Sequence, residues 1–112
     1  IRILDLLPGS GADPIVAELR PMSLDNLEAY EALSYTWGTP DNAVGIELNG
    51  YRLEAGPNLF AAMTRFRNPT KTRTLWIDAL CINQSSIEER TQQVRLMTLI
   101  YSKAAKVLVW LG

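Results

Sequence analysis

The chain has 112 residues, of which 47% are hydrophobic, and this is enough to build one core. Its formal net charge is −1, with both signs scattered along the sequence, so it shows no electrostatic footprint for nucleic acid. No apolar run approaches the ~20 residues of a membrane span, no signal peptide is visible, and the single cysteine excludes an internal disulfide. We therefore expect a cytoplasmic protein.

The first two predicted strands are short apolar runs on either side of a loop. Residues 1–7 and 15–20 have strand character, and residues 8–14 (PGSGADP) form a loop by their Gly and Pro content. We expect the two strands to pair as a hairpin with a long loop. Residues 1–29 are interpreted as a β lead-in, and residues 30–112 as the main domain.

Residues 32–37 predict a third strand, and its two faces differ in size. Leu33, Tyr35 and Trp37 point one way, whereas the side chains on the other face are small. A small face lets a helix or a neighbouring backbone come close. Turn residues at 38–42 (GTPDN) end the strand.

Residues 46–54 carry the strongest short-range signal for a β-hairpin, which is Asn49-Gly50 between alternating residues. A two-residue turn at this position predicts three cross-strand pairs. These pairs are Leu48 with Tyr51, Ile46 with Leu53, and Glu47 with Arg52. The charged pair lies on the solvent face and contributes ~0.2–1 kcal/mol.

Residues 58–67 predict an amphipathic helix. Pro57 and Asn58 open it, with Asn58 or the residue before it as the cap, and Asn68-Pro69 ends it. Apolar side chains at helical spacing form its buried stripe. They are Leu59, Ala62, Met63 and Phe66.

Residues 75–84 (LWIDALCINQ) are the most informative stretch of the chain. The opening Leu-Trp-Ile leaves no polar face, which is typical of a strand buried on both sides of a parallel sheet, and we expect that strand to cover residues 75–80. Asp78 stands at the end of the apolar run. Open α/β sheets bind their ligands outside the carboxyl ends of their strands, so Asp78 is the first candidate for a functional residue.

A helix and a further strand follow. Ser86 and Glu89 fit the Ser-x-x-Glu capping box, which predicts that a helix begins here. Apolar residues then recur at steps of three and four, so the helix covers residues 86–105. Residues 107–111 (VLVWL) form another apolar run of strand length. Strand, helix and strand make a βαβ crossover, which we expect to be right-handed.

These elements predict an α/β fold with an open, mainly parallel sheet of the Rossmann or flavodoxin type. Its parallel strands are residues 32–37, 75–80 and 107–111, with an N-terminal β extension and a β-hairpin insertion on one side. The chain lacks an initiator Met and stops just after an apolar strand. We therefore expect it to be a piece of a longer protein, truncated within the domain.

Polar and aromatic residues gather at the predicted carboxyl edge of this sheet. The candidate functional rim consists of Tyr35, Trp37, Asp78, Asn83 and Gln84, with Glu88 and Arg90 as weaker candidates. No histidine occurs in the sequence, so a Cys-His pair, a Ser-His-Asp triad and histidine-bearing zinc sites are excluded within this chain. No metal site is predicted.

The sequence leaves open whether several of these residues have a structural role instead of a functional one. In the structural interpretation, Asp78 organises the following turn or pairs with Arg90, and it does not bind a ligand. Glu88 and Glu89 favour the helix N-terminus through the helix dipole, worth about 0.3–1 kcal/mol. Cys81 is a small buried hydrophobe rather than a nucleophile.

Taken together, the motifs resemble the heterokaryon incompatibility (HET) domain of filamentous fungi over nearly the whole chain. They are YEALSYTWG at 30–38, PNLFAAM at 57–63, LWIDALCINQ at 75–84, ER..QV..M..IY..A at 89–104 and VLVWLG at 107–112. The resemblance implies a role in nonself recognition, in which fusion of genetically different hyphae triggers growth arrest and programmed cell death. It also implies a module of a larger protein, acting by self-association or through protein partners.

The family is similar in turn, at a distance, to TIR domains of innate immunity. Ser34-Tyr35 in a first strand, Ile77-Asp78 at the end of a second, an acidic helix start and the apolar strand at 107–111 follow the same order. Some TIR domains cleave NAD with a glutamate on a later helix, which by this likeness falls beyond Gly112. The alternative function is therefore a TIR-like NAD glycohydrolase in the full-length protein. This chain holds no complete catalytic site, and no cofactor other than NAD is implied.

Overall fold

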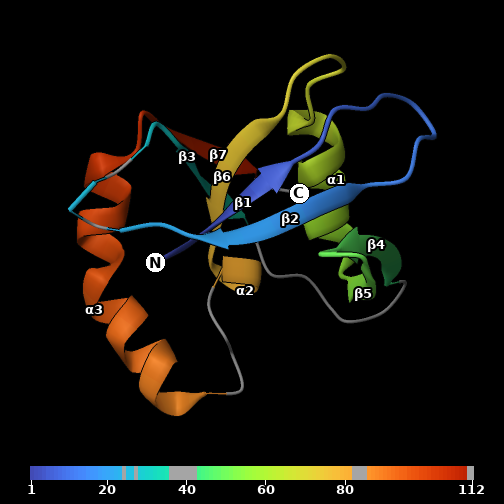
Figure 1. The fold of residues 1–112 in the computed structure, drawn as a ribbon. Helices are drawn as coiled ribbons and strands as arrows, with labels where there is room; N and C mark the ends of the chain where they lie inside the picture. The colour runs from blue at the N-terminus through green and yellow to red at the C-terminus, as the bar shows by residue number, and fades with distance from the viewer. Residues whose placement is uncertain (24, 27, 36–42, 82–85, 111–112) are drawn as a thin grey trace.

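The sheet of this protein has seven strands, and helices lie against both of its faces (Figure 1). The computed structural model describes residues 1–112 apart from 24, 27, 36–42, 82–85 and 111–112. The elements are β1 (Arg2–Leu6), β2 (Val16–Pro21), β3 (Glu31–Tyr35), β4 (Val44–Leu48), β5 (Tyr51–Ala55), α1 (Pro57–Phe66), β6 (Arg73–Ile77), α2 (Asp78–Cys81), α3 (Ile87–Lys103) and β7 (Lys106–Trp110).

The strand order is β5-β4-β2-β1-β6-β3-β7, and the directions are mixed. Of the six strand pairings among the described residues, β1–β2, β1–β6 and β4–β5 are antiparallel. The other three, β2–β4, β3–β6 and β3–β7, are parallel. The prediction of an open, mainly parallel Rossmann-type sheet is therefore wrong.

The reason for this difference is the position of β1. It forms the predicted hairpin with β2, but it also pairs with β6 and so occupies the centre of the sheet instead of an extension beside it. Ile3, Leu4 and Leu6 are each 0% exposed, as expected for a strand covered on both faces. The β4–β5 hairpin likewise continues the main sheet, because β4 pairs with β2.

Strands β6, β3 and β7 form a parallel unit within the mixed sheet. Leu33 of β3 pairs with Ile77 of β6, and Tyr35 pairs with Trp110 of β7. Strand β3 lies between the other two, so β6 and β7 share a direction without being neighbours. The carboxyl ends of all three strands meet at one edge.

The strand predicted at residues 75–80 begins and ends earlier than expected. It covers Arg73–Ile77, and the helical turn α2 begins at Asp78. Two features favour this helical turn. Its first residue, Asp78, is acidic, which favours the first turn of a helix. In addition, the Cys81 Sγ accepts a hydrogen bond from the Ile77 N–H at 3.3 Å, which joins the end of the turn to the strand.

The β4–β5 hairpin has the predicted register, with each of the three cross-strand pairs as expected. Asn49 has a φ of 51° and Gly50 a φ of 81°, as a two-residue type I′ turn requires. The ion-pair partner of Arg52 differs from the predicted Glu47, because the Arg52 Nε donates to Glu54 Oε1 at 2.9 Å on its own strand.

The helices begin close to their predicted positions. The N-cap of α1 is Gly56, one residue before the two expected caps, Pro57 and Asn58. Pro57 takes the first helical position, where its missing N–H costs nothing. The N-cap of α3 is Ser86, as predicted, and its Oγ accepts a hydrogen bond from the Glu89 N–H at 3.3 Å.

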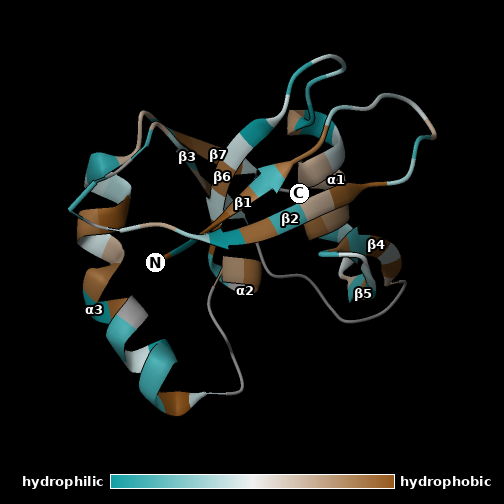
Figure 2. Ribbon diagram, in the orientation of Figure 1, coloured by the Kyte–Doolittle hydropathy of each residue, from teal (hydrophilic) through white to brown (hydrophobic). Residues whose placement is uncertain are grey.

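The two longer helices pack on opposite faces of the sheet, and Figure 2 shows hydrophobic segments both in the strands and on these helices. Phe66 of α1 contacts Trp110 edge-on, with ring centroids 6.2 Å apart. On the other face, Tyr101 of α3 contacts Trp76 at 5.6 Å. The small face of β3 lies under α3, as its residue sizes suggested. Among the described residues, no helix is long and apolar enough to cross a membrane.

Candidate functional site

The carboxyl edge of the parallel unit brings together residues from three elements. Tyr35 ends β3, and Asp78 directly follows β6 as the first residue of α2. Tyr101 comes from α3, where it packs on Trp76. We call Tyr35, Asp78 and Tyr101 the carboxyl-edge cluster. All three are partly exposed, so a ligand can reach them.

The charge of Asp78 acts on both phenols of the cluster. The two phenols lie on opposite faces of the sheet, because Tyr35 pairs with Trp110 on the side of α1, whereas Tyr101 belongs to α3. Burial raises the pKa of Tyr35, and the negative charge of Asp78 raises it further. The pKa of Tyr101 is also raised, first by burial and then by Asp78, while a hydrogen bond with Ser34 acts in the opposite direction. Both phenols therefore keep their protons at neutral pH. The cluster offers carboxylate acceptors beside hydroxyl donors, a set suited to ligand hydroxyls or to peptide backbone.

Cys81 ends α2, the helical turn that Asp78 begins, and is 1% exposed. Burial raises the pKa of its thiol to about 12, and the nearby charge of Asp78 adds to this effect. A thiol at neutral pH is a weak nucleophile, so Cys81 is a buried packing residue, in agreement with the sequence interpretation.

Arg2, like Tyr101, is a residue at this edge that sequence reasoning missed. It starts β1, and its guanidinium forms an ion pair with Glu89 in the first turn of α3. Its positive charge also acts on Cys81, where it lowers the thiol pKa against the effect of burial. The partners Arg2 and Glu89 are 87 positions apart in the chain, and no local pattern connects them.

Comparison with known proteins adds an independent finding. Residues 30–112 match the profile of the family described as heterokaryon incompatibility protein (HET). This chain belongs to the HET family. The resemblance seen in the sequence motifs is thereby confirmed.

One relative of this HET domain is heterokaryon incompatibility protein 6, OR allele, of Neurospora crassa. The two are 36% identical over 126 aligned positions, which cover 100% of this chain and 18% of the relative. The chain thus spans less than a fifth of the length of the curated relative it matches. No solved structure matches the chain.

The other predicted rim residues have different outcomes in this HET domain. Glu88 and Arg90 are exposed on α3. Trp37, Asn83 and Gln84 lie outside the described residues, and their place at the rim stays a prediction. Glu89, which was assigned to the helix dipole, has Arg2 as its ion-pair partner.

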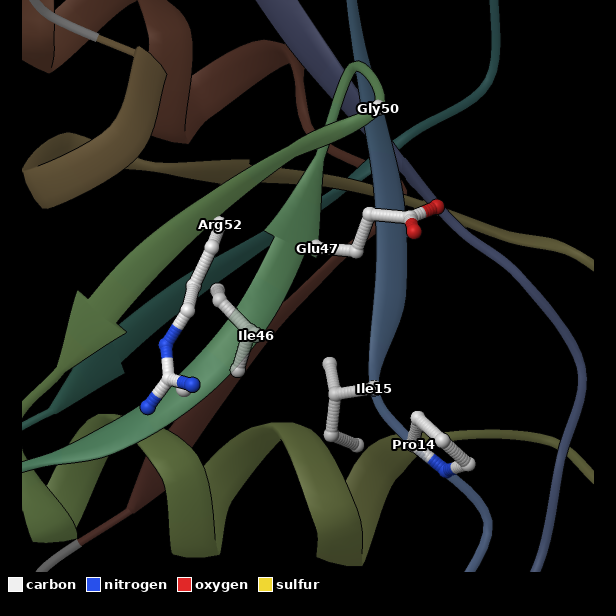
Figure 3. Close-up of a pocket in the computed structure, with 7 residues that line it drawn as sticks. Pro14, Ile15, Ile46, Glu47, Gly50 and Arg52 are labelled. Atoms are coloured by element: carbon white, nitrogen blue, oxygen red, sulfur yellow. The ribbon is translucent and has the colours of Figure 1, made fainter.

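A hollow in the HET domain lies far along the sheet from the cluster, between the start of β2 and the β4–β5 hairpin (Figure 3). It has a volume of about 420 Å³ and is lined by Pro14, Ile15, Gly45, Ile46, Glu47, Gly50 and Arg52. Arg52 extends over Gly45, where an added Cβ would lie 2.8 Å from the arginine Nε. The Glu47 carboxylate points away from the Arg52 guanidinium in Figure 3, so these charges do not converge on a ligand position.

Within the part of the chain that the structure describes, no group of three or more His, Cys, Asp or Glu side chains is placed to hold a metal ion. The carboxyl-edge cluster therefore remains the best candidate site, and its chemistry is hydrogen bonding around one carboxylate.

Proposed function

We propose that this HET domain acts in heterokaryon incompatibility, as a cytoplasmic signalling module that triggers growth arrest and cell death. Family membership and the named relative support the general role. The observation that carries the choice of site is the position of Asp78 at the carboxyl edge of three parallel strands, where its charge acts on two protonated phenols. In this proposal the cluster binds a protein partner or a second copy of the domain.

The chemistry of the cluster supports a protein ligand. A partly exposed carboxylate accepts hydrogen bonds from backbone N–H groups or from hydroxyls, and bonds to a charged acceptor are about twice as strong as neutral ones. Tyrosine combines a large apolar ring with a polar tip, which makes it common at interfaces. Tyr35 and Tyr101 supply both features, one on each face of the sheet edge that carries Asp78.

The first prediction concerns Asp78→Ala. When the full-length protein is expressed in a fungal host, this variant is expected to lose growth arrest, because the cluster loses its only carboxylate. Asp25→Ala is the matched control, since Asp25 is exposed on the connection between β2 and β3 and should leave the arrest unchanged. Protein abundance and circular dichroism show whether each variant is folded. If folded Asp78→Ala arrests growth as strongly as the control, Asp78 does not belong to the site.

A second candidate function is NAD cleavage by the full-length protein. It is favoured by one observation, that Asp78 follows β6 at the carboxyl edge of the parallel unit, and in open α/β sheets nucleotides bind at the carboxyl ends of parallel strands. A carboxylate there can accept hydrogen bonds from ribose hydroxyls. In this second candidate the catalytic glutamate is expected from sequence beyond Gly112, as the resemblance to TIR domains implies.

Incubation of the full-length protein with NAD separates the two functions. If the domain is a signalling module without this activity, no nicotinamide is released even at high protein concentration. Release by the wild type that falls at least tenfold in Asp78→Ala would instead identify a glycohydrolase, since a tenfold change corresponds to about 1.4 kcal/mol in transition-state stabilisation.

A further inference from the structure

The two halves of α3 are attached to the sheet very differently. The half near the C-terminus is fixed by Ile100, which is 0% exposed, by the Tyr30 hydroxyl donating to the Ile100 carbonyl, and by Tyr101 on Trp76. The half near the N-terminus extends away from the strands, as the orange part of α3 in Figure 1 shows. Ile87 and Val94 in this half are 72% and 57% exposed.

One ion pair connects the exposed half of α3 to the sheet. Among the residues that the structure describes, Arg2 with Glu89 is the ion pair that joins α3 to a strand. The two side chains are 38% and 26% exposed, so water weakens the pair only in part. Glu89 also donates its backbone N–H to the Ser86 cap, which ties this pair to the beginning of the helix.

The same arginine lies beside α2, the helical turn that carries Asp78. Leu4 pairs with Leu75 in the antiparallel register of β1 and β6, which puts Arg2 at the end of β6 where α2 begins, and β1 contacts α2. The charge of Arg2 acts on Cys81, the last residue of that turn. A helix of four residues does not hold its own shape in water, because nucleation of a helix is unfavourable. The position of Asp78 therefore depends on what surrounds α2, and Arg2 of β1 and the start of α3 are part of those surroundings.

We propose that Arg2 is a positioning residue of the carboxyl-edge cluster, which holds the start of α3 against β1 through Glu89 and thereby keeps α2 closed and Asp78 in place. Its link to function rests on the function proposed above. The structural part of the proposal concerns only Arg2, Glu89 and α2, and it can be tested without any measurement of activity.

Cys81 provides the test, because it is the single cysteine of the chain and is buried at the end of α2. Under native conditions a thiol reagent such as iodoacetamide reacts with Cys81 only when α2 opens, and peptide mapping by mass spectrometry gives the rate at this residue. Arg2→Ala and Glu89→Gln are expected to accelerate labelling about tenfold, as expected for loss of a hydrogen bond between charged groups. Loss of the Arg2 charge alone would raise the thiol pKa and slow the reaction, so an acceleration reports opening.

Two further variants make the test decisive. Arg20→Ala is the matched control, because Arg20 is also 38% exposed and also pairs with a carboxylate, Asp5, but on β1 and β2. The double variant R2E/E89R restores the pair with exchanged charges and should return labelling to the wild-type rate or below. Labelling that is no faster in Arg2→Ala and Glu89→Gln than in Arg20→Ala would overturn the proposal, as would failure of the exchanged pair to restore the slow rate.

The two proposals fail separately. If labelling follows these expectations while Asp78→Ala still arrests growth, the positioning of α2 by Arg2 stands and the assignment of function to Asp78 is wrong. Arg2→Lys keeps the charge without the planar guanidinium, and it should stay within about threefold of the wild-type labelling rate if the ion pair is what matters.

Discussion

Replacement of Trp76 with alanine is expected to unfold most of the protein or to lower its free energy of unfolding by about 3–5 kcal/mol. Trp76 of β6 is 0% exposed, and its ring packs edge-on against Tyr101. Ala32 is its neighbour on β3 and is too small to fill the space that the indole leaves. Because small domains are stable by only about 5–15 kcal/mol, this loss is a large share of the total.

Urea unfolding followed by circular dichroism measures the effect. Tyr51→Ala is the control, because Tyr51 is 78% exposed in the turn-proximal position of β5, and a change there should stay within about 0.5 kcal/mol. Trp76→Phe should be much milder than alanine, since the buried indole N–H has no hydrogen-bond partner among the described residues and phenylalanine removes that group. A midpoint for Trp76→Ala equal to that of Tyr51→Ala would show that the core is not centred on this side chain.

Arg73→Ala is expected to lower the free energy of unfolding by about 2 kcal/mol, between the values for surface and buried ion pairs. The Arg73 guanidinium binds Glu31 through two hydrogen bonds, from Nε at 2.6 Å and from Nη2 at 3.1 Å. Its Nη1 donates to the carbonyl of Phe66 at 2.7 Å, and the guanidinium lies 5.5 Å from the centroid of that ring. Loss of Arg73 leaves the Glu31 carboxylate, 19% exposed, without this partner.

The same ion pair predicts a pH dependence. Hydrogen bonds from Arg73 lower the pKa of Glu31 in the folded state, so the unfolded state binds more protons in acid. The stabilisation by Glu31 is fully present above its unfolded pKa of about 4.3 and is lost as the pH falls through the lower folded pKa. Unfolding free energies measured between neutral pH and about pH 3 should therefore fall less steeply for Glu31→Gln than for the wild type. Parallel curves for the two proteins would contradict this role.

Local features of this fold could be predicted from the sequence because their causes are local. The Asn49-Gly50 turn determines the hairpin register, since both residues adopt positive φ. The Ser86 cap was recognisable from its spacing to Glu89. The strand order could not be predicted in the same way. The central position of β1 depends on its pairing with β6, about 70 positions away, and a short apolar run carries no sign of that partner.

The same distinction applies to the candidate site. Tyr35 and Asp78 could be expected at one edge, because Tyr35 ends one parallel strand and Asp78 follows another. The charge of Asp78 does act on Tyr35. Tyr101 and Arg2 could not be expected there, since their positions depend on how α3 crosses the sheet and on the central place of β1. Pairings between distant segments decided what the local patterns left open.

The most direct test of the central claim is growth arrest by Asp78→Asn in the full-length protein. Asparagine has nearly the shape of aspartate and keeps one acceptor oxygen, so the variant should fold with a melting temperature close to that of the wild type, while the charge that acts on Tyr35 and Tyr101 is removed. We predict that hyphae expressing it at wild-type abundance keep growing. Arrest as complete as with the wild type, at equal abundance and equal melting temperature, would contradict a functional site at the carboxyl edge of this sheet.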